Sequence, residues 1–365
     1  MNIVYAYADT PEDVNSAEWR CSIPARAFQR SGLHTAQLIE LETFAKNTPE
    51  AQAACQAADV IIIQRNLYGP VLSAIQRWKA RDKMVIADLD DAFQLLPEKD
   101  QNYPFWFSGK RERCTADHQR ITETIDPPPL IQFKWGIRLV HAMTVPSEQM
   151  VSDWSEFADV YKLPNYMEIE RYLESPARAH EGIIIGWGGS SNHAQSFLDS
   201  GVLPALQKVC KARPQVRVMI CGDEQVFRLL PLPTEQKIFH PRVSYHDWPQ
   251  ELAYFDIGIA PLTTPYDQRR SWIKVMEYMA MKIPWIATDG PAYHSLGSYG
   301  WLVQNKANAW ERILLDMVDN LAGHKAEATS EPFIFSLSQS IDQNIDKILA
   351  LFQTIRTKNF IKGMN

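Results

Sequence analysis

The alternation of short apolar runs with helix-length segments is the feature that most limits how this chain can fold. Five runs in the first part of the sequence are rich in Val, Ile and other apolar residues, and "DVIIIQR" is typical of them. Near-continuous apolar runs indicate strands that are covered on both faces, as in a parallel sheet with helices on either side. The five predicted strands span 2–8, 35–41, 59–65, 83–91 and 141–147.

The same alternation starts again after residue 180. Two consecutive series of this kind predict an α/β protein with two Rossmann-like domains that face each other across a cleft, where ligands would bind at the carboxyl ends of the strands. A single helix is predicted over 196–212 and a loop near 325–340. The predicted strands of the second series span 182–189, 216–223, 255–262 and 284–289, with a short one near 242–248.

The expected domains follow from these two series. The N-terminal domain spans 1–165 and carries an insertion at about 92–135. The C-terminal domain spans 180–340, and a final helix over 341–365 could pack back on the N-terminal domain.

The overall composition excludes several classes of protein. The net charge of −6 argues against a general nucleic-acid binder. The five cysteines contain no CxxC pair, which disfavours a zinc site and fits reduced thiols. The first residues read as a strand and not as a signal peptide, and no apolar run approaches the length of a membrane span. We therefore expect a cytoplasmic protein, which could lie at the periphery of a membrane.

A polar stripe crosses an otherwise apolar predicted helix in "RRSWIKVMEYMAMKIPWIATDGP", residues 269–291. With a helix start near Arg270 or Ser271, the side chains of Arg270, Lys274 and Glu277 share a narrow arc of the helix surface. One interpretation is a salt-bridge ladder on a solvated face. The other is a ligand site, in which the cations bind phosphate and the carboxylate binds hydroxyl groups.

A glycine-rich turn follows the first strand of the second series. In "GIIIGWGGSSNH", Gly188 and Gly189 would let a phosphate approach the backbone, and Ser190 precedes the next helix. The spacing is not that of a dinucleotide-binding GxGxxG motif, and no GK[ST] of a P-loop follows. His193 in this turn could cap or pack the helix or contact a ligand.

Two aspartates end the fourth predicted strand in "ADLDDAF". Asp88 and Asp90 lie on the same side of a strand. They could be polar groups that face the cleft, structural caps of the strand end, or ligands of a metal ion. As a group in the cleft, Asp90 could act as a general base on an acceptor hydroxyl.

The predicted insertion mixes aromatic and basic residues, including Trp106 and Arg111. Such a mixture suits stacking on a sugar or a base. The alternative is a flap that packs its own aromatic side chains onto the domain.

The segment "DIGIAPL…RRSWIKVMEYMAMKIPWIATDGPAY" resembles the C-terminal signature of GT-B glycosyltransferases, particularly those similar to glycosyltransferase family 4. The resemblance also covers "GIIIGWGGSSNH", "AMTVPSEQMVSDW" and "AEWRCSIPARAFQRSG". It implies that Glu277 binds the ribose of a donor nucleotide and that Lys274 and Arg270 lie near its diphosphate. Many members carry a second glutamate eight residues before the first, but here that position is Arg269. Asp267 is a possible substitute.

The resemblance implies a glycosyltransferase, a hexosyl- or related sugar transferase, that moves a sugar from a nucleotide-sugar donor to a hydroxyl acceptor without a metal ion. UDP- or GDP-sugar would be the co-substrate, and no other cofactor is expected. The implied acceptor is a glycan, a lipid-linked or another hydroxyl compound, and a DNA acceptor is allowed but not favoured. The alternatives are a non-hydrolysing nucleotide-sugar epimerase and a catalytically silent nucleotide- or sugar-binding module.

The expected site residues form four groups. For the catalytic groups we expect Asp90 and Asp88. The donor nucleotide is expected to contact Glu277, Lys274, Arg270, Ser271, Gly188, Gly189, Ser190 and Gly222. For the donor sugar we expect Asp267 and His193, and for the acceptor Arg20, Trp106 and Arg111.

Overall fold

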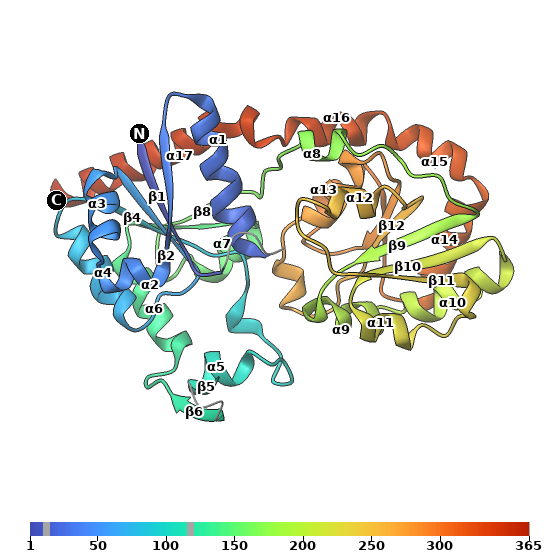
Figure 1. Ribbon diagram of the computed structural model, residues 1–365, viewed down its shortest axis with the longest axis horizontal. Coiled ribbons are helices and arrows are strands. Elements are labelled where there is room, and N and C mark those ends of the chain that lie inside the picture. The colour runs from blue at the N-terminus through green and yellow to red at the C-terminus, as the bar shows by residue number, and fades with distance from the viewer. Residues whose placement is uncertain (10–14, 115–119, 365) are drawn as a thin grey trace. The chain divides into compact units, whose positions relative to one another are not determined.

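The computed structural model describes residues 1–9, 15–114 and 120–364. The chain divides into two compact units (Figure 1). The first unit consists of Met1–Tyr166, Arg269–Ser271 and Ile341–Asn365, and the second of Met167–Gln268 and Trp272–Ser340. The second unit thus begins at Met167, before the expected position 180, and three residues of the expected C-terminal domain group with the first unit.

The first unit is built on a parallel six-stranded sheet in the order β2-β1-β3-β4-β7-β8. Every residue of the central strands β3 and β4 is buried, as their continuous apolar runs predicted. The strands are β1 (Asn2–Tyr7), β2 (Thr35–Glu40), β3 (Val60–Gln64), β4 (Met84–Asp88), β7 (Ala142–Val145) and β8 (Val160–Lys162).

Helices flank this sheet (Figure 1). A short π-helix, η1 (Glu18–Ser22), runs directly into α1, which the long C-terminal helix α17 packs against. The helices are α1 (Ile23–Ser31), α2 (Leu41–Lys46), α3 (Pro49–Ala57), α4 (Pro70–Lys79), α6 (Pro129–Leu139), α7 (Glu148–Trp154) and α17 (Ile341–Met364).

The insertion after β4 has its own secondary structure. It contains η2 (Phe93–Leu95), α5 (Tyr103–Ser108) and an antiparallel hairpin of β5 (Lys110–Cys114) and β6 (Arg120–Thr124). The expected range of 92–135 runs too far, because α6 begins at Pro129 and leads back into the sheet.

The second unit repeats the architecture with a parallel six-stranded sheet in the order β11-β10-β9-β12-β13-β14. Its core is formed by the apolar residues of β9, β10 and β12 and by the buried faces of α10 and α14. The strands are β9 (Ile183–Gly188), β10 (Val216–Gly222), β11 (Lys237–Pro241), β12 (Ile257–Ala260), β13 (Trp285–Thr288) and β14 (Trp301–Val303).

Three predicted elements of this unit are wrong in detail. The expected helix over 196–212 is two helices, because Gly201 with φ +84° separates them. The strand expected near 242–248 lies earlier, at β11, and the expected loop near 325–340 is largely helical. The helices are α8 (Glu170–Leu173), α9 (Ser191–Asp199), α10 (Val202–Ala212), α11 (Glu224–Leu229), α12 (Trp248–Leu252), α13 (Ile273–Ala280), α14 (Ala307–Asp319), α15 (Leu321–Ala328) and α16 (Glu331–Ser338).

Two parallel sheets with flanking helices confirm the predicted class of two Rossmann-like domains. Among the described residues, no helix is long and apolar enough to cross a membrane.

Candidate active site

The polar stripe predicted in residues 269–291 is shorter than expected. Helix α13 begins at Ile273, so Arg270 and Ser271 precede it and do not share its surface with Lys274 and Glu277. The expectation of three residues on one helical arc is therefore wrong for Arg270.

Contacts within the first unit hold residues 269–271, which precede α13. Arg269 forms an ion pair with Asp153, with its Nε 3.0 Å from the carboxylate. Its carbonyl accepts a hydrogen bond from Ser147. Arg270 lies 3.8 Å from Asp91, and Ser271 accepts a hydrogen bond from Asn165 at 3.0 Å.

Lys274 and Glu277 remain together on α13, one turn apart. Glu277 is only 6% exposed, which contradicts the alternative of a salt-bridge ladder on a solvated face. Its Oε1 accepts a hydrogen bond of 2.9 Å from the Tyr172 hydroxyl, and the Trp248 indole donates to the same carboxyl group. Burial raises the pKa of Glu277 to about 7, although both hydrogen bonds and the Lys274 ammonium act to lower it.

The ammonium of Lys274 donates to the carbonyl of Gly188 at the end of β9 and lies 5.4 Å from the centre of the Trp187 ring. It therefore sits at the glycine-rich turn that the sequence singled out. A carboxyl group and a cation meet here at the carboxyl end of a central strand, the usual ligand position in this class of fold.

The glycines of the turn serve close packing. A Cβ atom on Gly188 would lie 2.1 Å from the ring of Trp248, so only glycine fits beneath that indole. Gly222 has φ +97°, and a Cβ there would lie 2.7 Å from the carbonyl oxygen of Gly189. The N–H of Gly189 donates to the Cys221 carbonyl at 3.0 Å. This N–H is therefore bonded to the protein backbone, and the predicted approach of a phosphate to the turn stays a prediction.

Ser190 and His193 flank the start of α9. Ser190 is exposed and caps the helix through its carbonyl, which accepts from the His193 N–H at 2.8 Å. His193 is half-buried.

Asp267 is placed inside the fold. It is buried, and its Oδ2 accepts hydrogen bonds from Ser196 at 2.5 Å and Thr264 at 2.7 Å. These bonds tie the loop before α13 to α9.

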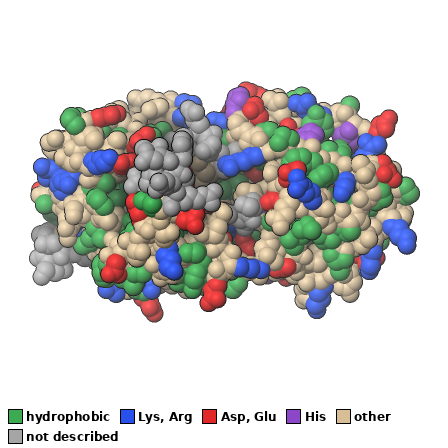
Figure 2. Space-filling view, turned by 60° about the horizontal axis from the view of Figure 1, so that its bottom comes forward, with side chains coloured by type: hydrophobic (Ala, Val, Ile, Leu, Met, Phe, Trp, Pro, Cys, Tyr) green, Lys and Arg blue, Asp and Glu red, His purple; other side chains and the backbone are tan. Residues whose placement is uncertain are grey.

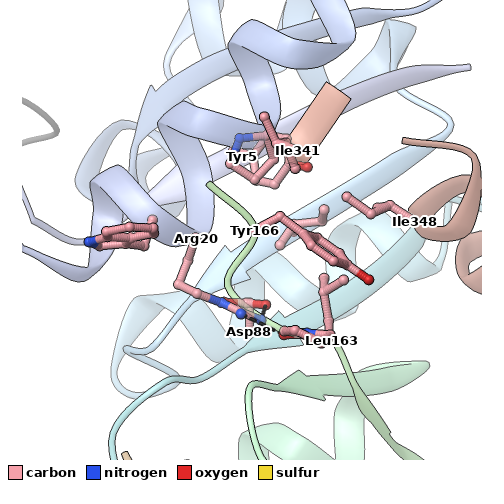
Figure 3. Close-up of a pocket in the computed structure, with 11 residues that line it drawn as sticks. Tyr5, Arg20, Asp88, Leu163, Tyr166, Ile341 and Ile348 are labelled. Atoms are coloured by element: carbon pink, nitrogen blue, oxygen red, sulfur yellow. Dashed lines mark hydrogen bonds and ion pairs between the residues drawn. The ribbon is translucent and has the colours of Figure 1, made fainter. Parts of the chain in front are cut away.

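In the first unit, Asp88 and Arg20 form a buried bidentate ion pair at the carboxyl end of β4 (Figure 3). Arg20 Nε and Nη2 each lie 2.7 Å from an Asp88 oxygen, and Thr144 adds a hydrogen bond of 2.6 Å. Arg20 Nη1 also donates to the Leu163 carbonyl and to Asn165, each at 2.7 Å.

This ion pair borders a cavity of about 20 Å³, which is room for a single water molecule. The expected free catalytic carboxylate at Asp88 and the expected acceptor contact at Arg20 are thus groups bonded to the protein itself.

Asp90 differs from Asp88 although it lies two residues away. It is half-buried, and its Oδ1 is covered and has no hydrogen-bond partner within the part of the chain that the structure describes. Burial raises the pKa of Asp90 to about 7, the carboxylates of Asp91 and Asp88 add to the rise, and nearby Arg20 and Arg65 oppose it. A carboxyl group that titrates near neutral pH suits a general base.

A metal site was the third alternative for the two aspartates. Within residues 1–9, 15–114 and 120–364, no group of three or more His, Cys, Asp or Glu side chains is arranged to hold a metal ion.

The two predicted acceptor residues of the insertion, Trp106 and Arg111, differ in their exposure to solvent. Trp106 is buried, stacks on Phe93 with ring centres 4.2 Å apart and meets the ring of Phe133 on α6 at 6.2 Å, so it packs the insertion onto its own unit. Arg111 on β5 is exposed. For Trp106, the flap interpretation describes the packing.

Tyr172 and Trp248 were not predicted from the sequence. Tyr172 lies in a segment that reads as a linker, and Trp248 in a segment that reads as a strand. The high number of tryptophans could have drawn attention to Trp248, but no spacing connects either residue to Glu277.

Comparisons with known proteins agree with this architecture. Residues 185–320 match the sequence profile of a family described as "Glycosyl transferases group 1". No curated protein sequence matches the chain.

Several solved structures share the fold. Sucrose-phosphate synthase from Thermosynechococcus elongatus aligns with a TM-score of 0.65 at 12% identity, over 98% of this chain and 99% of that one. Anabaena HepE in complex with UDP and glucose aligns with a TM-score of 0.62 at 12% identity, over 96% and 99%. A putative UDP-N-acetylglucosamine 2-epimerase from Listeria monocytogenes aligns with a TM-score of 0.57 at 11% identity, over 98% and 96%.

The profile match covers β9 to α14 and includes Lys274 and Glu277. The structural likeness, at these low identities, establishes the fold. The similarity to family 4 in particular stays a prediction. The chain therefore shares its two-domain fold with these structures, and residues 185–320 resemble the glycosyl transferases group 1 family.

Proposed function

We propose that the second unit binds a UDP- or GDP-sugar and that the protein transfers the sugar to a hydroxyl group of an acceptor. The observation that carries this proposal is the buried Glu277 carboxyl beside Lys274 at the glycine-rich turn. Anabaena HepE, which has the same fold, is known in complex with UDP and glucose.

The number of hydrogen-bond acceptor sites on Glu277 allows it to bind both hydroxyls of a vicinal diol. An ionised carboxylate offers about four acceptor sites, of which Tyr172 and Trp248 fill two. The remaining two match the two hydroxyls of a ribose. Desolvation at this position makes each such hydrogen bond stronger than in water.

Lys274 is a cation one turn from Glu277 on α13 and acts electrostatically on its carboxyl group. Its ammonium donates to the Gly188 carbonyl at the glycine-rich turn, and its positive charge would stabilise the diphosphate as it leaves. Ser190 at the start of α9 could add a hydroxyl, and the exposed position of this residue allows it.

We propose Asp90 as the general base if the reaction inverts the sugar's configuration, because it is the carboxyl group of the "DLD" motif that keeps unused acceptor capacity. Asp88 then supports the site indirectly by holding Arg20. We propose that the transfer needs no metal ion, since Lys274 supplies positive charge at the expected position of the diphosphate.

The first unit with its insertion is the proposed acceptor domain, and Arg111 is the exposed residue expected to contact the acceptor. We propose a glycan or lipid-linked hydroxyl compound and a cytoplasmic location. On the face drawn in Figure 2, basic and acidic side chains are interspersed, which does not favour a nucleic-acid acceptor.

A nucleotide-sugar epimerase is the second candidate, because the Listeria epimerase shares the fold. The two functions differ in their products. An epimerase converts the nucleotide sugar without an acceptor, whereas a transferase releases the nucleoside diphosphate only with one.

The test is a thermal-shift screen of the purified protein against UDP-, GDP-, ADP- and dTDP-sugars, followed by calorimetric titration of any stabiliser. Ligand at about 100 times its Kd should stabilise the protein by about 2.7 kcal/mol. Product analysis with the selected donor then separates transfer from epimerisation. If none of these compounds raises the melting temperature, the donor assignment is wrong.

A further inference from the structure

The Tyr172 side chain reaches Glu277 from a different element. Tyr172 lies on the short helix α8, is 2% exposed and donates its hydroxyl to Glu277 Oε1 at 2.9 Å. The same hydroxyl lies 3.5 Å from the hydroxyl of Tyr245. A tyrosine buried this deeply keeps its proton, because burial and the adjacent carboxyl both raise the pKa of Tyr172.

Trp248 fixes the carboxyl group from a second element, α12. Its indole donates to Glu277, and its ring lies against the backbone of Gly188, where a Cβ atom would collide with it. Two neutral donors from α8 and α12 thus hold one carboxyl group of α13. Neutral donors orient a carboxylate without cancelling its charge, unlike a bidentate guanidinium.

We propose that Tyr172 is a positioning residue for the nucleotide site. Its hydroxyl holds the Glu277 carboxyl in the ionised form and in the orientation that leaves two acceptor sites for the hydroxyls of the ribose of a nucleoside diphosphate. This inference rests on the proposed function.

The surroundings of the pair are otherwise poor in charge. Strands β12 and β13, on which α13 packs, contain no titratable residue, and Glu331 on α16 is exposed. Among the described residues, the other charged or titratable side chains around the two residues include Lys274, Tyr278, Cys221, Tyr245, Tyr293, Arg171 and Glu168, together with Glu170 on α8 and Glu251 on α12.

The ionisation of Glu277 therefore depends on few groups. Its pKa of about 7 is already raised by burial, and the Tyr172 hydrogen bond opposes that rise. Without this bond, the pKa should rise further, since a donor to the charged form stabilises that form. A smaller fraction of Glu277 would then be ionised at neutral pH.

The test uses the full chain with Tyr172→Phe, which removes one oxygen atom and keeps the ring. The titration of Glu277 is followed by NMR of protein labelled with ¹³C at the glutamate carboxyls, with Glu277→Gln to assign the signal. The midpoint should move up by about one pH unit in the variant.

The affinity for UDP and for GDP is then measured by calorimetry between pH 6 and pH 9. For a rise of about one unit, binding through the ionised form predicts a loss of about tenfold at pH 6, about threefold at pH 7.5 and almost none at pH 9. A merely structural role would instead weaken binding equally at every pH.

Tyr278→Phe is the matched control. Tyr278 is on the same helix, is equally buried and donates its hydroxyl to the Ile259 carbonyl at 3.0 Å. This variant should lose stability and leave the Glu277 midpoint in place.

An unchanged Glu277 midpoint in Tyr172→Phe, or a loss of affinity that does not vary with pH, overturns the inference. Failure of the wild-type protein to bind either diphosphate contradicts the proposed function instead, and this result appears before any variant is compared.

Discussion

Each unit contains a carboxyl group and a cation at the carboxyl end of its sheet, but the two pairs are connected differently. In the first unit, Arg20 donates hydrogen bonds to both carboxylate oxygens of Asp88. Its third nitrogen donates to the Leu163 carbonyl and to the Asn165 side chain. In the second unit, Lys274 donates to the backbone carbonyl of Gly188. The Glu277 carboxyl accepts its hydrogen bonds from two neutral donors, Tyr172 and Trp248.

The difference separates a structural pair from a candidate binding site. Asp88 has its charge neutralised by a buried guanidinium, whereas Glu277 keeps acceptor sites unused and titrates near neutral pH. Unfilled hydrogen-bonding capacity in a buried charged group is costly for the fold, so it is typical of positions where a ligand completes the site.

The largest effect is expected from breaking the pair in the first unit. Arg20→Met leaves Asp88 buried without its partner and should lower the free energy of unfolding by about 3–5 kcal/mol. Urea unfolding followed by circular dichroism measures it. Arg30→Met is the control, because the Arg30–Asp342 pair is largely exposed and should contribute less than about 1 kcal/mol. Equal losses in the two variants would mean that Arg20 is not structural and would return it to the acceptor site.

Asp90 tests whether the first unit also supplies a catalytic carboxyl group. Asp90→Asn should reduce kcat by about 10²-fold or more if Asp90 is the general base. Because the base acts when ionised, the wild-type rate should rise with pH up to about 7 and then level off. The variant should lack this rise.

Asp91→Asn is the control for Asp90. It removes a neighbouring carboxylate that raises the pKa of Asp90, so the activity should remain and the rising limb should move to lower pH. If Asp90→Asn keeps the wild-type rate and pH profile, the carboxyl group is not a base, as expected of an enzyme that retains configuration.

Glu277→Ala tests whether the carboxyl group of the second unit binds a ligand. It should weaken binding of the nucleotide sugar by more than about tenfold, because the hydrogen bonds of a charged acceptor to the ribose are lost. Calorimetry against the donor found by the screen measures this loss. Glu311→Ala changes a half-buried, ion-paired glutamate of the same unit, and this variant should bind the donor normally. Unchanged affinity in Glu277→Ala would place the donor elsewhere.

The smallest effect is expected for Arg111 in the insertion. Arg111→Ala should raise the KM for an anionic or hydroxyl-rich acceptor by about two- to fivefold at constant stability, since an exposed cation contributes little. Trp106→Ala should instead cost about 3–5 kcal/mol of stability, as removal of a buried aromatic ring does. Kinetics over a range of acceptor concentrations, together with thermal unfolding, distinguishes the two roles. Normal acceptor kinetics in Arg111→Ala would remove it from the acceptor site.

The sequence was sufficient for the two sheets and for the position of the donor motif. Runs such as that of β3 carry their signal in consecutive residues, because a strand covered on both faces must be apolar throughout. The resemblance in 255–291 likewise depends on local spacing, and Lys274 and Glu277 keep their relation because both lie on one helix.

The hydrogen-bond partners of the candidate site residues come from distant parts of the chain, and no local sequence pattern predicts these contacts. Arg20 meets Asp88 from 68 positions away, and Tyr172 meets Glu277 from 105 positions away. Whether a carboxyl group is structural or available to a ligand depends on such contacts, since burial and hydrogen bonding set its charge and its free acceptor sites. Asp88 and Asp90 look equivalent in the sequence, and only the packing around them makes one an ion-pair partner and the other a candidate base.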